Sequence, residues 1–351
     1  MHRLALDLYE DHARSALTPE AHAYVSGGAG HGAGVARNQE AWRALLLEPA
    51  LGRRLGALSA GVEILGRRYR FPCLVAPMAY QRLAHPEGER ATALAAAAQG
   101  AGFVLSCQTS LPADQVAAEP FWFQLYLQPE RAATRALVAA AVRAGAEALV
   151  VTMDAPLNGI RNAEIAAGFA LPAGIRPVML DGLPAAARSA VQDPIAGALA
   201  MAPDWAELAA LCAEVSLPVL AKGVMSVASA RAALAAGCAG VVVSNHGGRV
   251  LEGLPATAQV LAQIRAALPE ALILADGGIR SGEDLFRALA LGADAVLLGR
   301  PVFYALALGG AQGVSTCLRR LQDEFAVTMG LMGCETCAEI TPERLYRPAF
   351  T

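Results

Sequence analysis

The chain has 351 residues, of which 55% are hydrophobic and 17% are charged. This composition can bury a large core, so it excludes a protein that is mainly disordered. With 28 Lys and Arg against 31 Asp and Glu, the net charge is -3. Binding to a nucleic-acid backbone needs a basic surface, so we expect no nucleic-acid partner.

Residues 1–70 are predicted to form an N-terminal helical segment with a glycine-rich break at residues 26–30. The first residues include acidic side chains where a secretory signal would have an apolar core. We therefore expect a cytoplasmic protein.

The longest uncharged stretch, residues 91–113, has the length of a membrane span, but Gln, Gly, Ser, Thr and Pro interrupt it. These interruptions are typical of a helix, a turn and a strand in a water-soluble fold. We expect no membrane segment.

Eight short apolar runs are predicted as strands, because each ends in glycine or polar residues and alanine-rich helical stretches separate them. They are Cys73–Ala76, Gly102–Ser106, Trp122–Leu125, Leu149–Thr152, Pro218–Lys222, Val241–Ser244, Leu272–Asp276 and Ala295–Leu298. Eight β/α units close a parallel (β/α)8 TIM barrel, here over residues 71–310 of a single domain. The alternative is a doubly wound open sheet, but no Gly-x-Gly-x-x-Gly motif follows the first strand.

Two further segments lie outside the repeat. The connection between the fourth and fifth strands is the longest, which predicts a lid over residues 157–203. Residues 311–351 are predicted as a C-terminal helical segment. It holds a Cys-x-x-Cys pair, Cys334 and Cys337, without the further Cys or His ligands of a metal site. We interpret the seven scattered cysteines as structural thiols and predict no metal.

In such a barrel the catalytic groups come from the carboxyl ends of the strands, and these ends are rich in polar residues. In chain order they carry Pro77, Met78, Ala79, Ser106, Gln124, Tyr126, Thr152, Asp154, Lys222, Ser244, His246, Arg249, Asp276, Gly277, Gly278, Arg280, Gly299 and Arg300.

The ends of the last two strands are where barrels of this type often bind a phosphate. Gly277, Gly278 and Gly299 allow backbone N–H groups to approach an anion, and Arg280 and Arg300 add positive charge. The alternative is that these are turn glycines and surface arginines.

His246 directly follows an apolar strand, with Asp154 at another strand end to orient it and Arg249 three residues further on. A lone histidine is often structural, but this combination favours a catalytic base beside an anion anchor. Lys222 ends a strand inside the barrel, where a buried ammonium needs a negative partner. It could be a Schiff-base lysine or a fixed counter-charge.

At these residues the chain resembles the FMN-dependent α-hydroxy acid oxidases and dehydrogenases, a family that includes glycolate, lactate and mandelate-oxidising enzymes. The resemblance covers about residues 5–340 and follows seven segments in family order. They are residues 76–89, 122–126, 152–156, 220–223, 243–249, 276–280 and 299–301.

The resemblance implies a role for each matched residue. FMN would be bound by Pro77, Met78, Ala79, Ser106, Gln124, Thr152, Lys222, Ser244, Asp276, Gly277, Gly278, Arg280, Gly299 and Arg300. His246 would be the general base, held by Asp154, and Tyr126 would assist catalysis. Arg161 and Arg249 would bind the substrate's carboxylate, and Tyr24 and Tyr126 would hydrogen-bond to its carboxylate and hydroxyl.

The activity so implied is FMN-dependent oxidation of an (S)-2-hydroxy acid to the 2-oxo acid, with O2 as acceptor and H2O2 as product. Gln108 stands where many members that prefer glycolate carry a bulky aromatic residue, so we expect a larger substrate, of medium chain length or mandelate-like. The resemblance also implies a homotetramer. Two alternatives are a dehydrogenase with another acceptor or a specialised amine or peptide-derived substrate, and a non-catalytic flavin- or phosphate-binding barrel.

Overall fold

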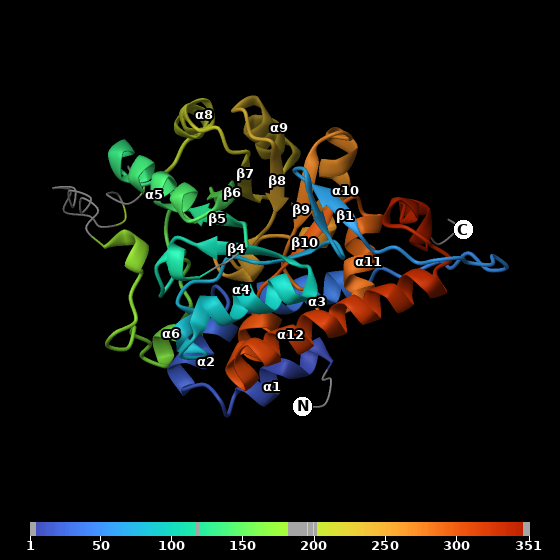
Figure 1. The fold of residues 1–351 in the computed structure, drawn as a ribbon, viewed down its shortest axis with the longest axis horizontal. Coiled ribbons are helices and arrows are strands. Elements are labelled where there is room, and N and C mark those ends of the chain that lie inside the picture. The colour runs from blue at the N-terminus through green and yellow to red at the C-terminus, as the bar shows by residue number, and fades with distance from the viewer. Residues whose placement is uncertain (1–4, 117–118, 182–194, 196–198, 200–201, 347–351) are drawn as a thin grey trace.

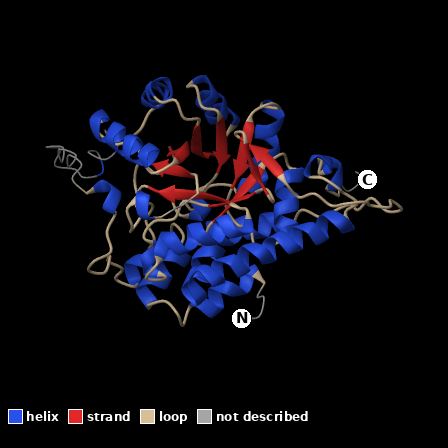
Figure 2. Cartoon of the chain, in the orientation of Figure 1, coloured by secondary structure: helices blue, strands red, loops and turns tan. Residues whose placement is uncertain are grey.

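The computed structural model describes residues 5–116, 119–181, 195, 199 and 202–346. Its centre is a closed barrel of parallel strands in the order β10-β3-β4-β5-β6-β7-β8-β9. Figure 2 shows these strands at the centre of the molecule with helices around them. The prediction of a (β/α)8 barrel is confirmed.

The barrel strands are β3 (Cys73–Val75), β4 (Gly102–Ser106), β5 (Phe121–Leu125), β6 (Ala146–Thr152), β7 (Val219–Val224), β8 (Gly240–Val243), β9 (Leu272–Ala275) and β10 (Ala295–Leu298). The bounds predicted for β4 and β10 agree with the structure, and the others differ by one to three residues. Ser244 and Asp276, predicted as the last residues of strands, directly follow β8 and β9. Both residues therefore still lie at the carboxyl end of the barrel.

Successive side chains of each strand point alternately to the inside and the outside of the barrel, and this divides the core into two layers. Leu74 of β3, Val104 of β4 and Val150 of β6 belong to a cluster inside the barrel. Their neighbours in the strands, such as Val75 and Leu105, pack in a larger cluster with the surrounding helices. Strands buried on both faces therefore need the nearly continuous apolar runs that the sequence has.

The helical prediction for residues 1–70 does not hold at the end of this segment, which contains two short strands. Helices α1 (Tyr9–Ala13), α2 (Pro19–Ser26) and α3 (Ala33–Arg43) are followed by an antiparallel hairpin of β1 (Val62–Ile64) and β2 (Arg67–Tyr69). Ile64 and Tyr69 pack into the cluster inside the barrel. The hairpin thus closes the end of the barrel opposite the carboxyl ends of the strands.

The helices that follow the strands are α4 (Gly88–Gln99), α5 (Arg131–Arg143), α6 (Asn162–Ala166), α8 (Trp205–Glu214), α9 (Val227–Ala235), α10 (Thr257–Ala267), α11 (Gly282–Ala290) and α12 (Arg300–Leu331). The long α12 runs beside α4, α11 and α1 (Figure 1). It is interrupted by non-helical backbone at Gly309 and Gly310, so the boundary predicted at residues 310 and 311 falls at a break within this helix.

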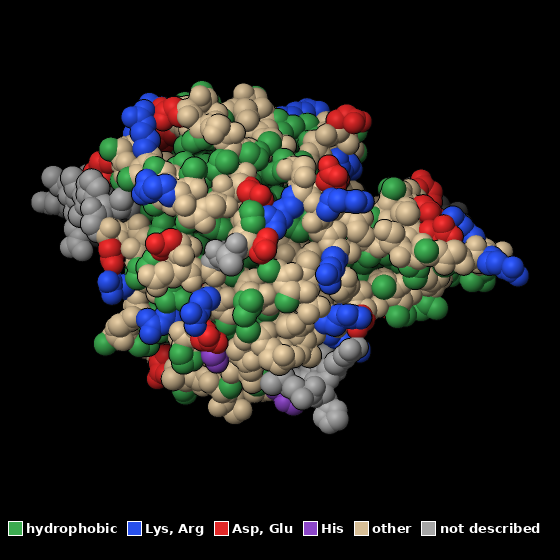
Figure 3. Space-filling view, viewed as in Figure 1, with side chains coloured by type: hydrophobic (Ala, Val, Ile, Leu, Met, Phe, Trp, Pro, Cys, Tyr) green, Lys and Arg blue, Asp and Glu red, His purple; other side chains and the backbone are tan. Residues whose placement is uncertain are grey.

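The predicted lid, residues 157–203, is only partly described. Its beginning contains α6 and a 3-10 turn at Val178–Leu180, whereas residues 182–194, 196–198 and 200–201 lie outside the described residues. In the described part of the chain, no helix is both long and apolar enough to cross a membrane. On the face drawn in Figure 3, basic and acidic side chains are interspersed rather than gathered by sign.

The Cys-x-x-Cys pair lies in the C-terminal segment. The Cys334 thiol donates a hydrogen bond to the carbonyl of Glu339 at 3.5 Å, and the Cys337 thiol donates to the carbonyl of Ala60 at 3.3 Å. Both thiols therefore link backbone segments, which agrees with a structural role.

Candidate active site

One cavity at the carboxyl end of the barrel brings nearly all of the predicted site residues together. It is lined by Tyr24, Pro77, Met78, Ala79, Ser106, Gln108, Gln124, Tyr126, Thr152, Arg161, Lys222, His246, Arg249, Asp276, Gly277, Gly278, Arg280, Gly299 and Arg300. Two predicted residues, Asp154 and Ser244, lie behind this lining and contact residues that form it.

A row of buried polar side chains follows three neighbouring strands. The Ser106 hydroxyl donates to Oε1 of Gln124 at 2.9 Å, and Nε2 of Gln124 donates to the Thr152 hydroxyl at 3.0 Å. The strands are in register at these points, with Ser106 opposite Gln124. The row fixes the amide of Gln124 and gives this wall hydrogen-bonding groups of defined orientation.

Lys222 continues this polar layer from β7. Its Nζ lies 3.2 Å from Oδ2 of Asp276 and donates a hydrogen bond of 2.9 Å to the Ser244 hydroxyl. Burial alone would lower the pKa of Lys222, but the negative charges of Asp276 and Asp154 outweigh it and raise the pKa. An ammonium held protonated in this way is a fixed cation, whereas a Schiff-base lysine needs a neutral amine.

His246 and Asp154 form a pair that joins the ends of two strands. Nδ1 of His246 is 3.1 Å from Oδ1 and 3.3 Å from Oδ2 of Asp154. Because a carboxylate can only accept, the Nδ1 nitrogen carries the hydrogen in this contact. Burial by itself would raise the pKa of Asp154, but the charge and hydrogen bond of His246 and the charge of Lys222 lower it below its usual value. Asp154 is therefore ionised and can stabilise a proton taken up by His246.

The backbone at His246 is in the left-handed region, with φ of 57°. A residue other than glycine rarely adopts this conformation, and local contacts must hold it there. The Ser244 hydroxyl accepts from the His246 backbone N–H at 3.0 Å. Nearby, Asn245 exchanges side-chain hydrogen bonds of 2.8 and 2.9 Å with Asn38 of α3. The N-terminal helices thus brace the turn that carries His246.

Two arginines lie at the lid side of the cavity. Arg249 is tied to the end of α2, since its Nη1 donates to the carbonyls of Tyr24 at 2.7 Å and Gly27 at 2.8 Å. Arg161, at the start of the lid, pairs with Glu164 at 2.9 Å. Both guanidiniums lie over the ring of Tyr24, at 5.9 Å for Arg161 and 5.2 Å for Arg249. Burial, together with the neighbouring charge of Arg300, lowers the pKa of Arg249 to about 10, so this region favours an anion.

Arg280 and Arg300 form a second cationic region at the ends of β9 and β10. Arg300 donates to the carbonyls of Val25 at 3.0 Å and Gly247 at 2.9 Å, and Arg280 donates to the carbonyl of Ile279 at 2.8 Å. Burial lowers the pKa of both guanidiniums. Within the described residues neither makes an ion pair, so two half-buried positive charges have no carboxylate partner and would suit a phosphate.

Backbone geometry completes this anion region. Gly278 has φ of 90°, and a Cβ atom there would lie 2.6 Å from the backbone carbonyl of Asn38. Only glycine therefore fits at this position. Oδ1 of Asp276 is buried without a hydrogen-bond partner among the described residues, and a donor on a bound molecule would satisfy it.

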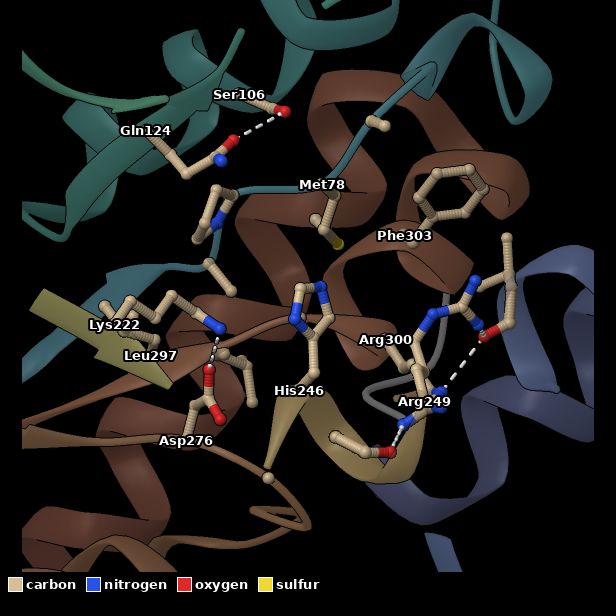
Figure 4. Close-up of a pocket in the computed structure, with 18 of the residues that line it drawn as sticks. Met78, Ser106, Gln124, Lys222, His246, Arg249, Asp276, Leu297, Arg300 and Phe303 are labelled. Atoms are coloured by element: carbon tan, nitrogen blue, oxygen red, sulfur yellow. Dashed lines mark hydrogen bonds and ion pairs between the residues drawn. The ribbon is translucent and has the colours of Figure 1, made fainter. Parts of the chain in front are cut away.

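Figure 4 shows how these groups are arranged. His246 lies between the Lys222–Asp276 pair on one side and Arg249 and Arg300 on the other, while Ser106 and Gln124 form a separate wall. An imidazole oriented by a carboxylate, a fixed cation and several arginines therefore meet in one cavity. Such a site can bind an acid and remove a proton from it.

The cavity also has lining residues that sequence analysis missed. They are Val25, Ala76, Asn158, Gly247, Ile279, Leu297, Leu298 and Phe303. Asn158 lies three residues before Arg161, in the loop between β6 and α6, where this spacing gives no signal. Phe303, in the first turn of α12, and Leu297, near the end of β10, look like ordinary core residues in the sequence. In the described part of the chain, no group of three or more His, Cys, Asp or Glu could hold a metal ion.

Comparison with known proteins gives concordant matches. A family model described as FMN-dependent dehydrogenase matches residues 13–347. An L-lactate oxidase from Roseobacter sp. is 48% identical over 97% of this chain and 94% of its own length. A 4-hydroxymandelate oxidase from Amycolatopsis orientalis is 42% identical over 92% of this chain and 93% of its own length. A crystal structure of mandelate oxidase with (S)-4-hydroxymandelic acid superposes with a TM-score of 0.89 at 38% identity, covering 97% of this chain and 98% of that one.

Proposed function

Because the chain belongs to the FMN-dependent dehydrogenase family, we propose that it oxidises an (S)-2-hydroxy acid to the 2-oxo acid, with O2 as acceptor and H2O2 as second product. It is an FMN-dependent oxidoreductase acting on the CH–OH group of 2-hydroxy acids. The observation that carries the proposal is the His246–Asp154 pair in one cavity with Arg161 and Arg249.

The residues present fit FMN. The guanidiniums of Arg280 and Arg300, which make no ion pair within the described residues, would hold the phosphate. Oδ1 of Asp276, which has no hydrogen-bond partner among the same residues, would accept from a ribityl hydroxyl. Ser106, Gln124 and Thr152 would face the polar edge of the ring system. When bound, FMN supplies the acceptor for the electron pair that leaves the substrate. Lys222 would keep a positive charge beside it, which stabilises negative charge that grows during reduction.

The remaining residues bind and deprotonate the substrate. A 2-hydroxy acid carries a carboxylate, which Arg161 and Arg249 would hold through charge-assisted hydrogen bonds. Burial raises the pKa of Tyr126, so its neutral hydroxyl can donate to the substrate's hydroxyl. Nε2 of His246 would accept the hydroxyl proton if hydrogen leaves carbon as a hydride, or the Cα proton if a carbanion forms. In both routes Asp154 stabilises the imidazolium.

Two observations support a substrate larger than glycolate. Gln108 lines the cavity, and its side chain makes no hydrogen bond within the described residues, so it leaves room and an amide for the 2-substituent. The relatives named for lactate and 4-hydroxymandelate, which both have a substituent at this carbon, are 48% and 42% identical to this chain, whereas a glycolate oxidase from Zea mays is 38% identical.

The choice of O2 as acceptor is supported by the names of the same relatives, which are oxidases. The test is to incubate the purified enzyme with L-lactate or (S)-mandelate in air and measure O2 consumed, H2O2 formed and 2-oxo acid formed. We expect equal amounts of all three. Turnover that needs an added dye or quinone, with no H2O2, would contradict O2 as the acceptor.

A further inference from the structure

Arg161 and Arg249 are held in different ways. The Arg249 guanidinium donates to carbonyls at the end of α2, at 2.7 Å to Tyr24 and 2.8 Å to Gly27. Arg161 has no such backbone anchor, and within the described residues the only polar partner of its side chain is Glu164, at 2.9 Å. The orientation of Arg161 therefore depends on one carboxylate.

The two guanidiniums also repel each other. Both lie over the same Tyr24 ring, and the charge of Arg161 contributes to lowering the pKa of Arg249. Oε2 of Glu164 is 2.9 Å from Nη1 of Arg161 and 3.9 Å from Nη2 of Arg249. This oxygen makes no hydrogen bond among the described residues, so it offsets the repulsion of the two cations through its negative charge. Without it, the only contact among the described residues that would keep the Arg161 guanidinium next to Arg249 is the one with the Tyr24 ring.

Glu164 is placed for this task by α6. It lies in the first turn of this helix, three residues after Arg161, and its backbone carbonyl accepts from the N–H of Phe169 at 3.1 Å. The Phe169 ring in turn stacks on Tyr24 at 4.5 Å. The Glu164 side chain is 18% exposed and is absent from the lining of the cavity. It therefore reaches the cavity only through the two arginines.

We propose that Glu164 is a positioning residue that holds Arg161 beside Arg249, so that the two guanidiniums are ready to bind the substrate's carboxylate. The inference rests on the proposed function, in which these arginines bind that carboxylate. An opposite effect is conceivable, because a nearby negative charge also repels an incoming anion. Glu164 touches the guanidiniums and not the cavity, so loss of the Arg161 orientation should outweigh the relief of repulsion.

The experiment measures carboxylate binding separately from turnover. The FMN-loaded enzyme is titrated with pyruvate, a 2-oxo acid that it cannot oxidise at a hydroxyl, and Kd is read from the change in the flavin spectrum. The variants are Glu164→Gln, Arg161→Met and the double variant. Asp181→Asn is the matched control, since it removes one negative charge from an exposed ion pair with Arg176 in the same segment.

We expect Glu164→Gln to raise Kd for pyruvate and KM for the 2-hydroxy acid about tenfold, the effect of losing one partly buried charge, with a much smaller change in kcat. In the Arg161→Met background the same substitution should change Kd less than twofold, because Glu164 acts through Arg161. Glu164→Asp, which keeps the charge on a shorter side chain, should restore part of the affinity, and Asp181→Asn should leave Kd unchanged.

Tighter pyruvate binding by Glu164→Gln, an unchanged Kd, or an equal loss in both backgrounds would overturn the inference. If Glu164→Gln does not retain FMN, Glu164→Asp carries the test: its loss of affinity must disappear in the Arg161→Met background. Failure of the proposed function itself would be seen in the arginine variants. In that case neither Arg161→Met nor Arg249→Met would weaken pyruvate binding.

Discussion

At the scale of single residues, the chemistry depends on how neighbours set the charge of each group. His246 has its Nδ1 hydrogen directed to Asp154, and Lys222 is held protonated by Asp276. The cavity therefore combines an imidazole that a carboxylate orients with a fixed cation. This combination suits removal of a proton from a bound anion, because the positive charges stabilise negative charge as it develops.

His246→Ala tests the base. The variant should bind FMN normally, because FMN contacts are expected from other residues, but flavin reduction by substrate should be slower by about 100- to 10,000-fold, the usual contribution of a general base. Stopped-flow absorbance under anaerobic conditions measures the rate. His12→Ala, at an exposed position, is the control. Near-normal reduction in His246→Ala would remove His246 as the base.

Gln108→Trp tests the pocket for the 2-substituent. The larger ring should fill the space that Gln108 leaves and shift the ratio of kcat/KM for glycolate over lactate by at least about tenfold, within the range of pocket-based discrimination. Gln115→Trp, at an exposed position, serves as the control. If the ratio stays the same in Gln108→Trp, Gln108 does not set substrate size.

At the scale of elements, the barrel could be predicted because each strand is an apolar run that ends in polar residues, and the same ends supplied most of the site. The hairpin of β1 and β2 could not be predicted, since two strands of three residues around Leu65-Gly66 are too short to show a periodic pattern. Glu164 and Phe303 were missed for another reason. Their positions depend on how α6 and α12 pack at this end of the barrel, which no local spacing records.

The contact between α11 and α12 gives a prediction at this scale. A Cβ atom on Gly282 would lie 2.2 Å from the backbone nitrogen of Phe325, so Gly282→Ala must push the two helices apart. Overpacking of this kind costs about 1–3 kcal/mol, and we expect Tm to fall by a few degrees in thermal unfolding. Gly253→Ala should leave Tm unchanged, since a Cβ atom there would meet no packed neighbour within 4 Å among the described residues. Equal Tm values for both variants would contradict the close contact.

At the scale of the whole molecule, the cofactor should be part of the folded structure. Its proposed ligands come from the ends of most of the strands, including Ser106 of β4, Lys222 of β7 and Arg300 after β10. A molecule that contacts so many strand ends stabilises the closed barrel by binding only its folded form.

The homotetramer implied by the family resemblance stays a prediction, and light scattering of the purified protein measures it.

Removal of FMN should therefore lower stability. At a free FMN concentration 100 times Kd, the linkage relation gives about 2.7 kcal/mol of stabilisation, so the apoprotein should unfold at a lower Tm and regain it when FMN is added. Riboflavin is the control ligand, because it lacks the phosphate that Arg280 and Arg300 would hold. Equal stabilisation by riboflavin and FMN would contradict a phosphate site at these arginines.

The most direct test of the account is anaerobic mixing of the FMN-loaded enzyme with glycolate, L-lactate, 2-hydroxyoctanoate and both enantiomers of mandelate, followed by visible absorbance. The account predicts bleaching of the flavin bands by (S)-2-hydroxy acids, faster with a substituted acid than with glycolate, and recovery of the bands when air is admitted. A yellow protein whose flavin none of these acids bleaches would contradict 2-hydroxy acid oxidation by this site.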